Sequence, residues 1–146
     1  AAYFVPDRRM LAALKDARRR GVQVKLMLAG KSDVPVVQLA GRASYERLLG
    51  WGVQIHEWCA AVFHAKTAVV DGVWATVGSF NLDRWSMLRN HELNVVFADP
   101  GIAGTLQRAF ESDCTRCTRI EPGTWAARPW RQRVLQRLAW IFRRWL

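Results

Sequence analysis

The pair Asp71-Gly72, set between two β-rich runs, constrains the fold of this chain more than any other feature. The runs cover residues 63–70 and 73–79. Asp-Gly between two such runs is the strongest short-range signal for a β-hairpin with a two-residue turn. The middle of the chain is therefore predicted to be an antiparallel pair of strands.

This predicted hairpin sorts its side chains onto two faces, because neighbouring residues of a strand point to opposite sides. It places His64 opposite Ser79 and Lys66 opposite Val77, with Asn81 just beyond on the same face as His64 and Lys66. That face then collects an imidazole, an ammonium, a hydroxyl and an amide. The other face is predicted to be core and carries Phe63, Ala65, Val69, Trp74 and Phe80.

The four polar groups suit a phosphodiester substrate. An imidazole can attack phosphorus, and Lys66, Asn81 and Ser79 can bind the nonbridging oxygens, whose charge must be stabilised in the transition state. No metal or other cofactor is predicted, because His64 has no second His or Cys at ligand spacing and the Lys66 ammonium would repel a cation. Asp71 lies in the turn, where an Asp bonds its own backbone, so its predicted role is structural.

The segments around the hairpin alternate between strand and helix, which predicts an α/β fold with parallel neighbouring strands. The length of 146 residues fits one domain. We expect this domain to cover residues 1–125 and a separate tail to cover residues 126–146. The predicted strands are 3–5, 22–28, 53–58 and 91–98, and the predicted helices are 7–21, 35–49 and 102–116.

The charge of the chain points to anionic partners. Its formal charge is +10, with 22 Lys and Arg against 12 Asp and Glu, and this suits nucleic acid, phospholipid head groups or phosphorylated substrates. Three cysteines are too few for a disulfide framework and indicate reduced thiols in a cytosolic environment. No apolar run reaches the roughly 18 residues that span a bilayer, and no signal peptide is visible.

The tail has the pattern of a basic amphipathic helix. Arginines fill several of its faces, and residues 128–146 contain no acid. Such a helix suits the interface of an anionic membrane. The alternative is a terminal helix docked on its own core through the same apolar stripe. That stripe contains Trp130, Val134, Leu138, Ile141, Phe142 and Trp145.

The hairpin residues also resemble the signature of the phospholipase D superfamily. His64-x-Lys66, four residues, Asp71, six residues and then Gly78-Ser79-x-Asn81 match the HxKxxxxD motif and its GSxN extension. The resemblance implies a mixed sheet with flanking helices that forms one half of a two-motif fold, with the basic tail helix added.

The same resemblance implies roles for the site residues. His64 would be the nucleophile or the general acid, Lys66 and Asn81 would hold phosphate, and Ser79 would support the site. The family also has a carboxylate shortly downstream that orients the histidine, and Glu92 stands where it is expected. A surface position on a strand is the alternative for Glu92.

Further segments look like the C-terminal half of bacterial cardiolipin synthases, especially the form without transmembrane helices. They are 3–7, Gly30-Lys31-Ser32-Asp33, 75–83 and 92–94. Two departures are His91, where an aromatic is usual, and the Cys59-Ala60-Ala61 stretch.

This likeness implies phosphatidyl transfer between phospholipids, with phosphatidylglycerol as substrate, through a phosphohistidine. The second HxKxxxxD half would come from a missing N-terminal region or from a homodimer mate. The expected location is peripheral, at the cytoplasmic face of the bacterial cell membrane. The alternatives are a homodimeric phosphodiesterase or nuclease of the same superfamily and a noncatalytic membrane-binding remnant. The tail and the synthase-like segments speak against nucleic acid as the partner.

Overall fold

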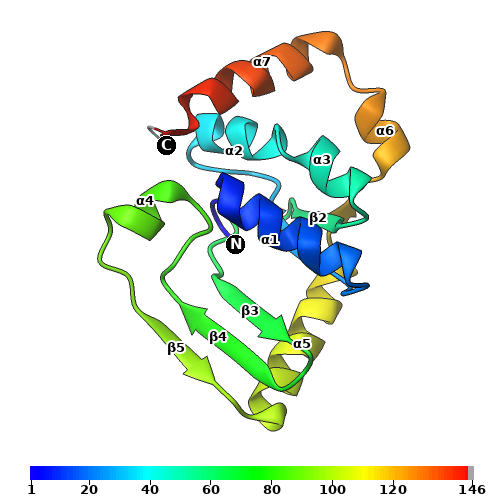
Figure 1. Ribbon diagram of the computed structural model, residues 1–146. Helices are drawn as coiled ribbons and strands as arrows, with labels where there is room; N and C mark the ends of the chain where they lie inside the picture. Colours follow the sequence, from blue (N-terminus) through cyan, green and yellow to red (C-terminus); the bar gives the residue numbers. More distant parts are fainter. Residues whose placement is uncertain (145–146) are drawn as a thin grey trace.

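The strands of the protein form two three-stranded sheets, and the second of them lies toward one end of the molecule (Figure 1). The computed structural model describes the backbone of residues 1–144 and the side chains of residues 1–143. In the first sheet, β1 (Lys25–Ala29) pairs in parallel with β2 (Gln54–Trp58), which pairs antiparallel with β6 (Thr118–Arg119). The second sheet is antiparallel in the order β3 (Thr67–Val70), β4 (Trp74–Gly78) and β5 (Asn94–Phe97). The predicted α/β architecture with a parallel strand pair is confirmed.

Two of the longer helices begin where the sequence supplies a side-chain cap. Asp7 accepts a hydrogen bond from the Met10 N–H at 2.7 Å, and Asp99 accepts one from Ile102 at 2.8 Å. Short elements at 84–88, 118–119 and 122–126 were not predicted. The helices are α1 (Arg8–Arg19), α2 (Pro35–Arg42), α3 (Tyr45–Gly50), α4 (Arg84–Leu88), α5 (Pro100–Cys114), α6 (Pro122–Ala126) and α7 (Trp130–Ile141), followed by a 3₁₀ turn at Phe142–Arg144.

The single helix predicted over 35–49 is wrong, because the structure divides it into α2 and α3. The Ser44 hydroxyl donates to the Gly41 carbonyl oxygen at 2.7 Å, where it competes with the helical backbone pattern. The break turns α3 so that it can bury Tyr45, Leu48 and Leu49 against the first sheet and α1. The core cluster consists of Phe4, Leu11, Leu28, Tyr45, Leu48, Leu49, Val53 and Ile55.

The hairpin is confirmed, but its predicted register is wrong by one residue. The observed turn takes three residues, 71–73, and Val70 pairs with Trp74. Asp71 and Gly72 adopt φ values of 52° and 68°, a left-handed conformation that Asp and Gly tolerate better than other residues. Lys66 therefore stands opposite Gly78 instead of Val77, and the Gly78 N–H donates to the Lys66 carbonyl oxygen at 3.1 Å.

This shift by one residue moves every side chain of β4 to the other face of the sheet. Ala75 pairs with Val69 and is fully buried, as is Ala103 of α5, the helix that packs on this sheet. Trp74 is 36% exposed, so its predicted place in the core is wrong. The face that carries Val70, Trp74 and Val96 points away from α5.

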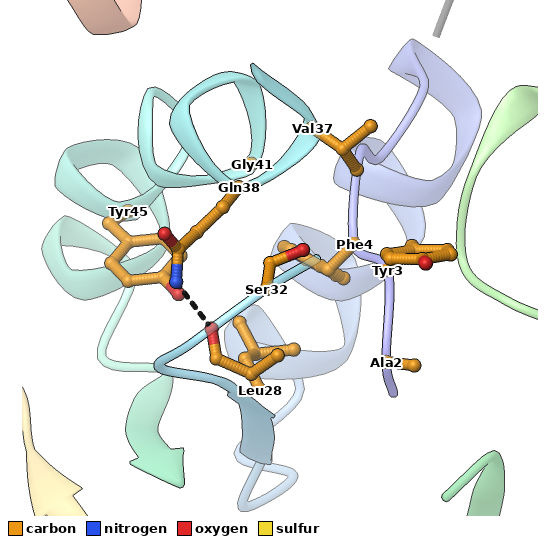
Figure 2. A pocket seen from close by; sticks show the side chains of 10 residues that line it. Ala2, Tyr3, Phe4, Leu28, Ser32, Val37, Gln38, Gly41 and Tyr45 are labelled. Atoms are coloured by element: carbon orange, nitrogen blue, oxygen red, sulfur yellow. Dashed lines mark hydrogen bonds between the residues drawn. The ribbon is translucent and has the colours of Figure 1, made fainter. Parts of the chain in front are cut away.

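The segment before α1 joins the two sheets. Phe4 forms a parallel bridge with Leu82, and the Val5 N–H donates to the Leu82 carbonyl oxygen at 2.9 Å. Side chains of an extended segment alternate, and Figure 2 shows Phe4 and Tyr3 pointing to opposite sides of it. Phe4 packs in the core. Tyr3 therefore points to the opposite, polar side of the segment.

Helix α7 packs along α2, at the end of the molecule far from the second sheet (Figure 1). Ala139 reaches a small apolar cluster with Val5 and Ala40. The part of the tail that the structure describes therefore lies against the rest of the chain, whereas the predicted boundary at residue 125 stays a prediction. Among the described residues, no helix is long and apolar enough to cross a membrane.

Candidate active site

The sequence-predicted site residues lie at one end of the second sheet. Lys66 immediately precedes β3, Ser79 immediately follows β4, and Glu92 lies two residues before β5. Neighbouring antiparallel strands run in opposite directions, so the start of β3, the end of β4 and the start of β5 meet at the same end. Asp71 lies in the turn at the opposite end of the hairpin.

The Lys66 ammonium lies against the His64 ring. Its Nζ is 2.9 Å from His64 Nδ1 and 3.0 Å from Nε2, and it donates to the His64 carbonyl oxygen at 3.0 Å. An ammonium has donors only, so a ring nitrogen that bonds to it must be unprotonated and accept. Lys66 is buried whereas His64 is exposed. Burial lowers the pKa of Lys66, and the charges of Glu92, Asp33 and Asp83 act in the opposite direction.

Ser79 and Glu92 form a second contact beside this pair. The Ser79 hydroxyl donates to Glu92 Oε2 and accepts from the Leu93 N–H at 3.0 Å. The bond from Ser79 lowers the pKa of Glu92, because it stabilises the charged carboxylate. Asn90 donates to the other oxygen, Oε1, at 3.3 Å. Glu92 thus accepts hydrogen bonds from Ser79 and Asn90. Its expected role in orienting His64 stays a prediction.

Asn81 is buried and held by the segment before α1. Its Oδ1 accepts from the Tyr3 backbone N–H at 3.2 Å. Because a backbone N–H requires an acceptor, this bond fixes which end of the amide is oxygen and leaves the Nδ2 end to donate to a substrate oxygen.

Gly78 permits the close approach of β5 at this end of the sheet. A Cβ atom there would lie 2.3 Å from the Leu93 carbonyl oxygen and 2.6 Å from Asn94 Cα. Both contacts are shorter than real Cβ atoms show, and both involve backbone, so a side chain would force β4 and β5 apart. Gly78 therefore acts on the site through the spacing of the strands that carry Ser79 and Glu92.

Tyr3 and Asp33 join the site, although no role was predicted for either residue. The Tyr3 hydroxyl donates to both carboxylate oxygens of Asp33, at 2.8 and 3.0 Å. This bond lowers the pKa of Asp33 and raises that of Tyr3, and the negative charge of Asp33 also interacts with His64 and Lys66. One signal could have found Asp33, since it follows β1 at the carboxyl end of a parallel strand, where sites in α/β sheets gather.

No metal cluster accompanies these residues in the described part of the chain, where no three His, Cys, Asp or Glu side chains lie so that they could hold an ion. The Lys66 ammonium is positively charged, and the neutral amide of Asn81 adds a hydrogen-bond donor. Both suit the nonbridging oxygens of a phosphodiester.

Comparison with known proteins identifies the family of this chain. Residues 1–114 match the family model described as the phospholipase D-like domain of cardiolipin synthase. The chain belongs to this family. It is 37% identical over 144 residues to cardiolipin synthase B of Salmonella typhimurium, covering 98% of this chain and 35% of that protein. The chain thus spans about a third of the length of the curated relatives it matches.

Two solved structures share the phospholipase D-like fold. Nuc, a phospholipase D family member from Salmonella typhimurium, superposes with a TM-score of 0.70 at 21% identity, over 82% of this chain and 78% of Nuc. Phosphatidylserine synthase of Haemophilus influenzae also gives 0.70, at 15% identity, over 97% of this chain but 38% of the other. At these identities the likeness concerns the fold alone, and it confirms the predicted fold class.

Proposed function

We propose that this chain supplies one of two histidine-lysine motifs in a phosphatidyltransferase that makes cardiolipin from phospholipids. The observation that carries the proposal is the contact of the Lys66 ammonium with the His64 ring, at the sheet end where Ser79 and Asn81 also lie. The sequence match to cardiolipin synthases supports this activity over other phosphodiester chemistry.

The proposed reaction has two displacement steps. One histidine attacks the phosphorus of a phospholipid such as phosphatidylglycerol, forming an N–P bond as the bond to the head-group alcohol breaks, and the partner histidine protonates the departing oxygen. The hydroxyl of a second lipid then loses its proton to that partner and attacks the phosphohistidine, breaking the N–P bond. Lys66 and Asn81 hold the phosphoryl oxygens in both steps, and His64 serves as either the nucleophile or the acid.

A second half is required by this scheme, either from another segment of a longer protein or from a second copy. An apolar face of the second sheet is available to it. Val70, Trp74 and Val96 share the face away from α5 and are 48%, 36% and 55% exposed. A contiguous exposed apolar surface of this kind is typical of an interface.

The experiment that tests the proposed activity follows the products of the two-motif enzyme. Vesicles of phosphatidylglycerol should yield cardiolipin and free glycerol in equal amounts, without added metal. A parallel reaction offers plasmid DNA, because the charge of +10 also suits a nuclease of the same superfamily. DNA cleavage without cardiolipin would establish the nuclease alternative, and inactivity on both substrates would leave a noncatalytic remnant.

We also propose that α7 binds an anionic membrane surface and makes the protein peripheral at the cytoplasmic face of the bacterial cell membrane. Gln136 and Ala139 are buried toward α2, so the docked side of the helix is not the apolar stripe. The alternative of docking through that stripe is wrong for the described residues, whereas Trp145 of the stripe lies outside them. The exposed apolar side chains of α7 and the following 3₁₀ turn are Trp130, Val134, Leu135, Leu138, Ile141 and Phe142.

Membrane binding is tested with point variants, because deleting the tail would uncover Val5 and Ala40. Leu135 and Leu138 are about half exposed, and each can contribute about 1 kcal/mol when the bilayer buries it. Leu135→Ser with Leu138→Ser should therefore weaken binding to phosphatidylserine vesicles about 10-fold to 30-fold. Sedimentation with the vesicles measures this binding.

Ile102→Ser is the matched control, since Ile102 is an exposed aliphatic residue on α5. It should bind like the unmodified protein. Neutral vesicles should bind all variants weakly, because exposed arginines each add about 1 kcal/mol at an anionic surface. Equal binding of the α7 variant and the control would remove the membrane role.

A further inference from the structure

A cavity of about 270 Å³ opens beside Asn81. This volume lies just below the usual range of small-molecule pockets, about 300 to 1,000 Å³, which suits a small polyol and is too little for a diacyl lipid. A second cavity, shown in Figure 2, holds about 20 Å³, enough for a single water. The larger cavity is therefore big enough for a small ligand, and it lies next to the proposed phosphoryl site.

Its walls combine polar groups with two aromatic side chains. The polar lining residues are Asn81, Asp83, Ser86 and Asn90, and the others are Tyr3, Trp85 and Val37. The Ser86 hydroxyl is buried in this wall and interacts with the carboxylates of Asp83 and Glu92. A hydroxyl has two acceptor lone pairs, so Ser86 can still accept a hydrogen bond from a ligand in the cavity.

We infer that this cavity is the subsite for the polyol end of the alcohol that accepts the phosphatidyl group. The inference rests on the proposed function and adds where the acceptor binds. Asn81 lines the cavity and also holds the phosphoryl group in the proposed mechanism, so an alcohol in the cavity lies next to phosphorus.

A glycerol head group suits this chemistry. One of its hydroxyls attacks phosphorus, forming the new O–P bond as the N–P bond breaks, and gives its proton to the partner histidine. Its neighbouring hydroxyl can bond to Ser86 or Asn90, while its C–H face packs on the Trp85 ring. Water competes as the acceptor and gives phosphatidic acid, so the subsite determines the ratio of transfer to hydrolysis.

The test measures this ratio in the two-motif enzyme with phosphatidyl-p-nitrophenol as donor and glycerol as acceptor. The aromatic leaving group reports formation of the phosphohistidine separately from the fate of the phosphatidyl group. Trp85→Ala should lower the ratio of phosphatidylglycerol to phosphatidic acid about 10-fold at a fixed glycerol concentration. Ser86→Ala should lower it in the same direction, and it serves as the second variant if Trp85→Ala does not fold.

Leu88→Ala is the matched control, because Leu88 lies on the same helix, is 63% exposed and does not line the cavity. It should leave the ratio unchanged. An unchanged ratio in both cavity variants, with normal release of p-nitrophenol, would overturn the subsite and leave the proposed function standing. No release of p-nitrophenol by the unmodified enzyme would overturn the proposed function, and the subsite with it.

Discussion

His64→Ala is expected to abolish phosphatidyl transfer by the two-motif enzyme while leaving its fold intact. The imidazole either bonds to phosphorus or protonates the departing alcohol. Its loss should lower the rate by about 10² to 10⁴ if it is the acid and by up to about 10⁶ if it is the nucleophile. His64 is exposed and lies outside the strands, so the free energy of unfolding should change by less than about 0.5 kcal/mol. The initial rate of cardiolipin formation and a thermal unfolding curve measure the two effects.

His91→Ala provides the control for removing an imidazole near the same sheet end. His91 is also exposed and precedes β5, and no step of the proposed mechanism involves it. This variant should keep most of the rate. If His64→Ala retained more than about a hundredth of the rate, His64 would be neither the nucleophile nor the acid.

The chain studied alone as a monomer is expected to lack meaningful turnover. The departing alkoxide needs a proton on the side of phosphorus opposite the attack, and one imidazole cannot serve both sides. Loss of general acid catalysis costs about 10² to 10⁴ in rate. Neither Glu92 nor His56 is an obvious substitute, because Glu92 is bound to Ser79 and His56 lies in β2, in the other sheet.

The sequence was most informative where local chemistry determines the structure. Asp71-Gly72 specified the hairpin, because few residues tolerate the positive φ that this turn requires. The one-residue error in register arose because a three-residue turn uses the same Asp-Gly pair as a two-residue turn. That error placed Trp74 in the core, although the structure exposes it.

The remaining features of the site depend on contacts between distant segments. Tyr3 reaches Asn81 and Asp33 only because residues 3–5 run beside Leu82, and no local pattern encodes that bridge. The sequence of the tail shows an apolar stripe, because its apolar residues recur at helical spacing. That spacing does not tell which side of the helix faces the protein. Helix α4, which carries Trp85 and Ser86 into the cavity wall, has five residues and is too short for a periodic signal.

If one motif is half of an active site, the rate per chain must depend on whether the chain is associated with a second half. The purified chain is sized in solution, and each fraction is assayed with phosphatidylglycerol and with a chromogenic phosphodiester. We expect the monomer to be inactive and turnover to appear only when a second HxKxxxxD half is present, from another segment or from a second copy. Robust turnover by a strictly monomeric chain would contradict this expectation.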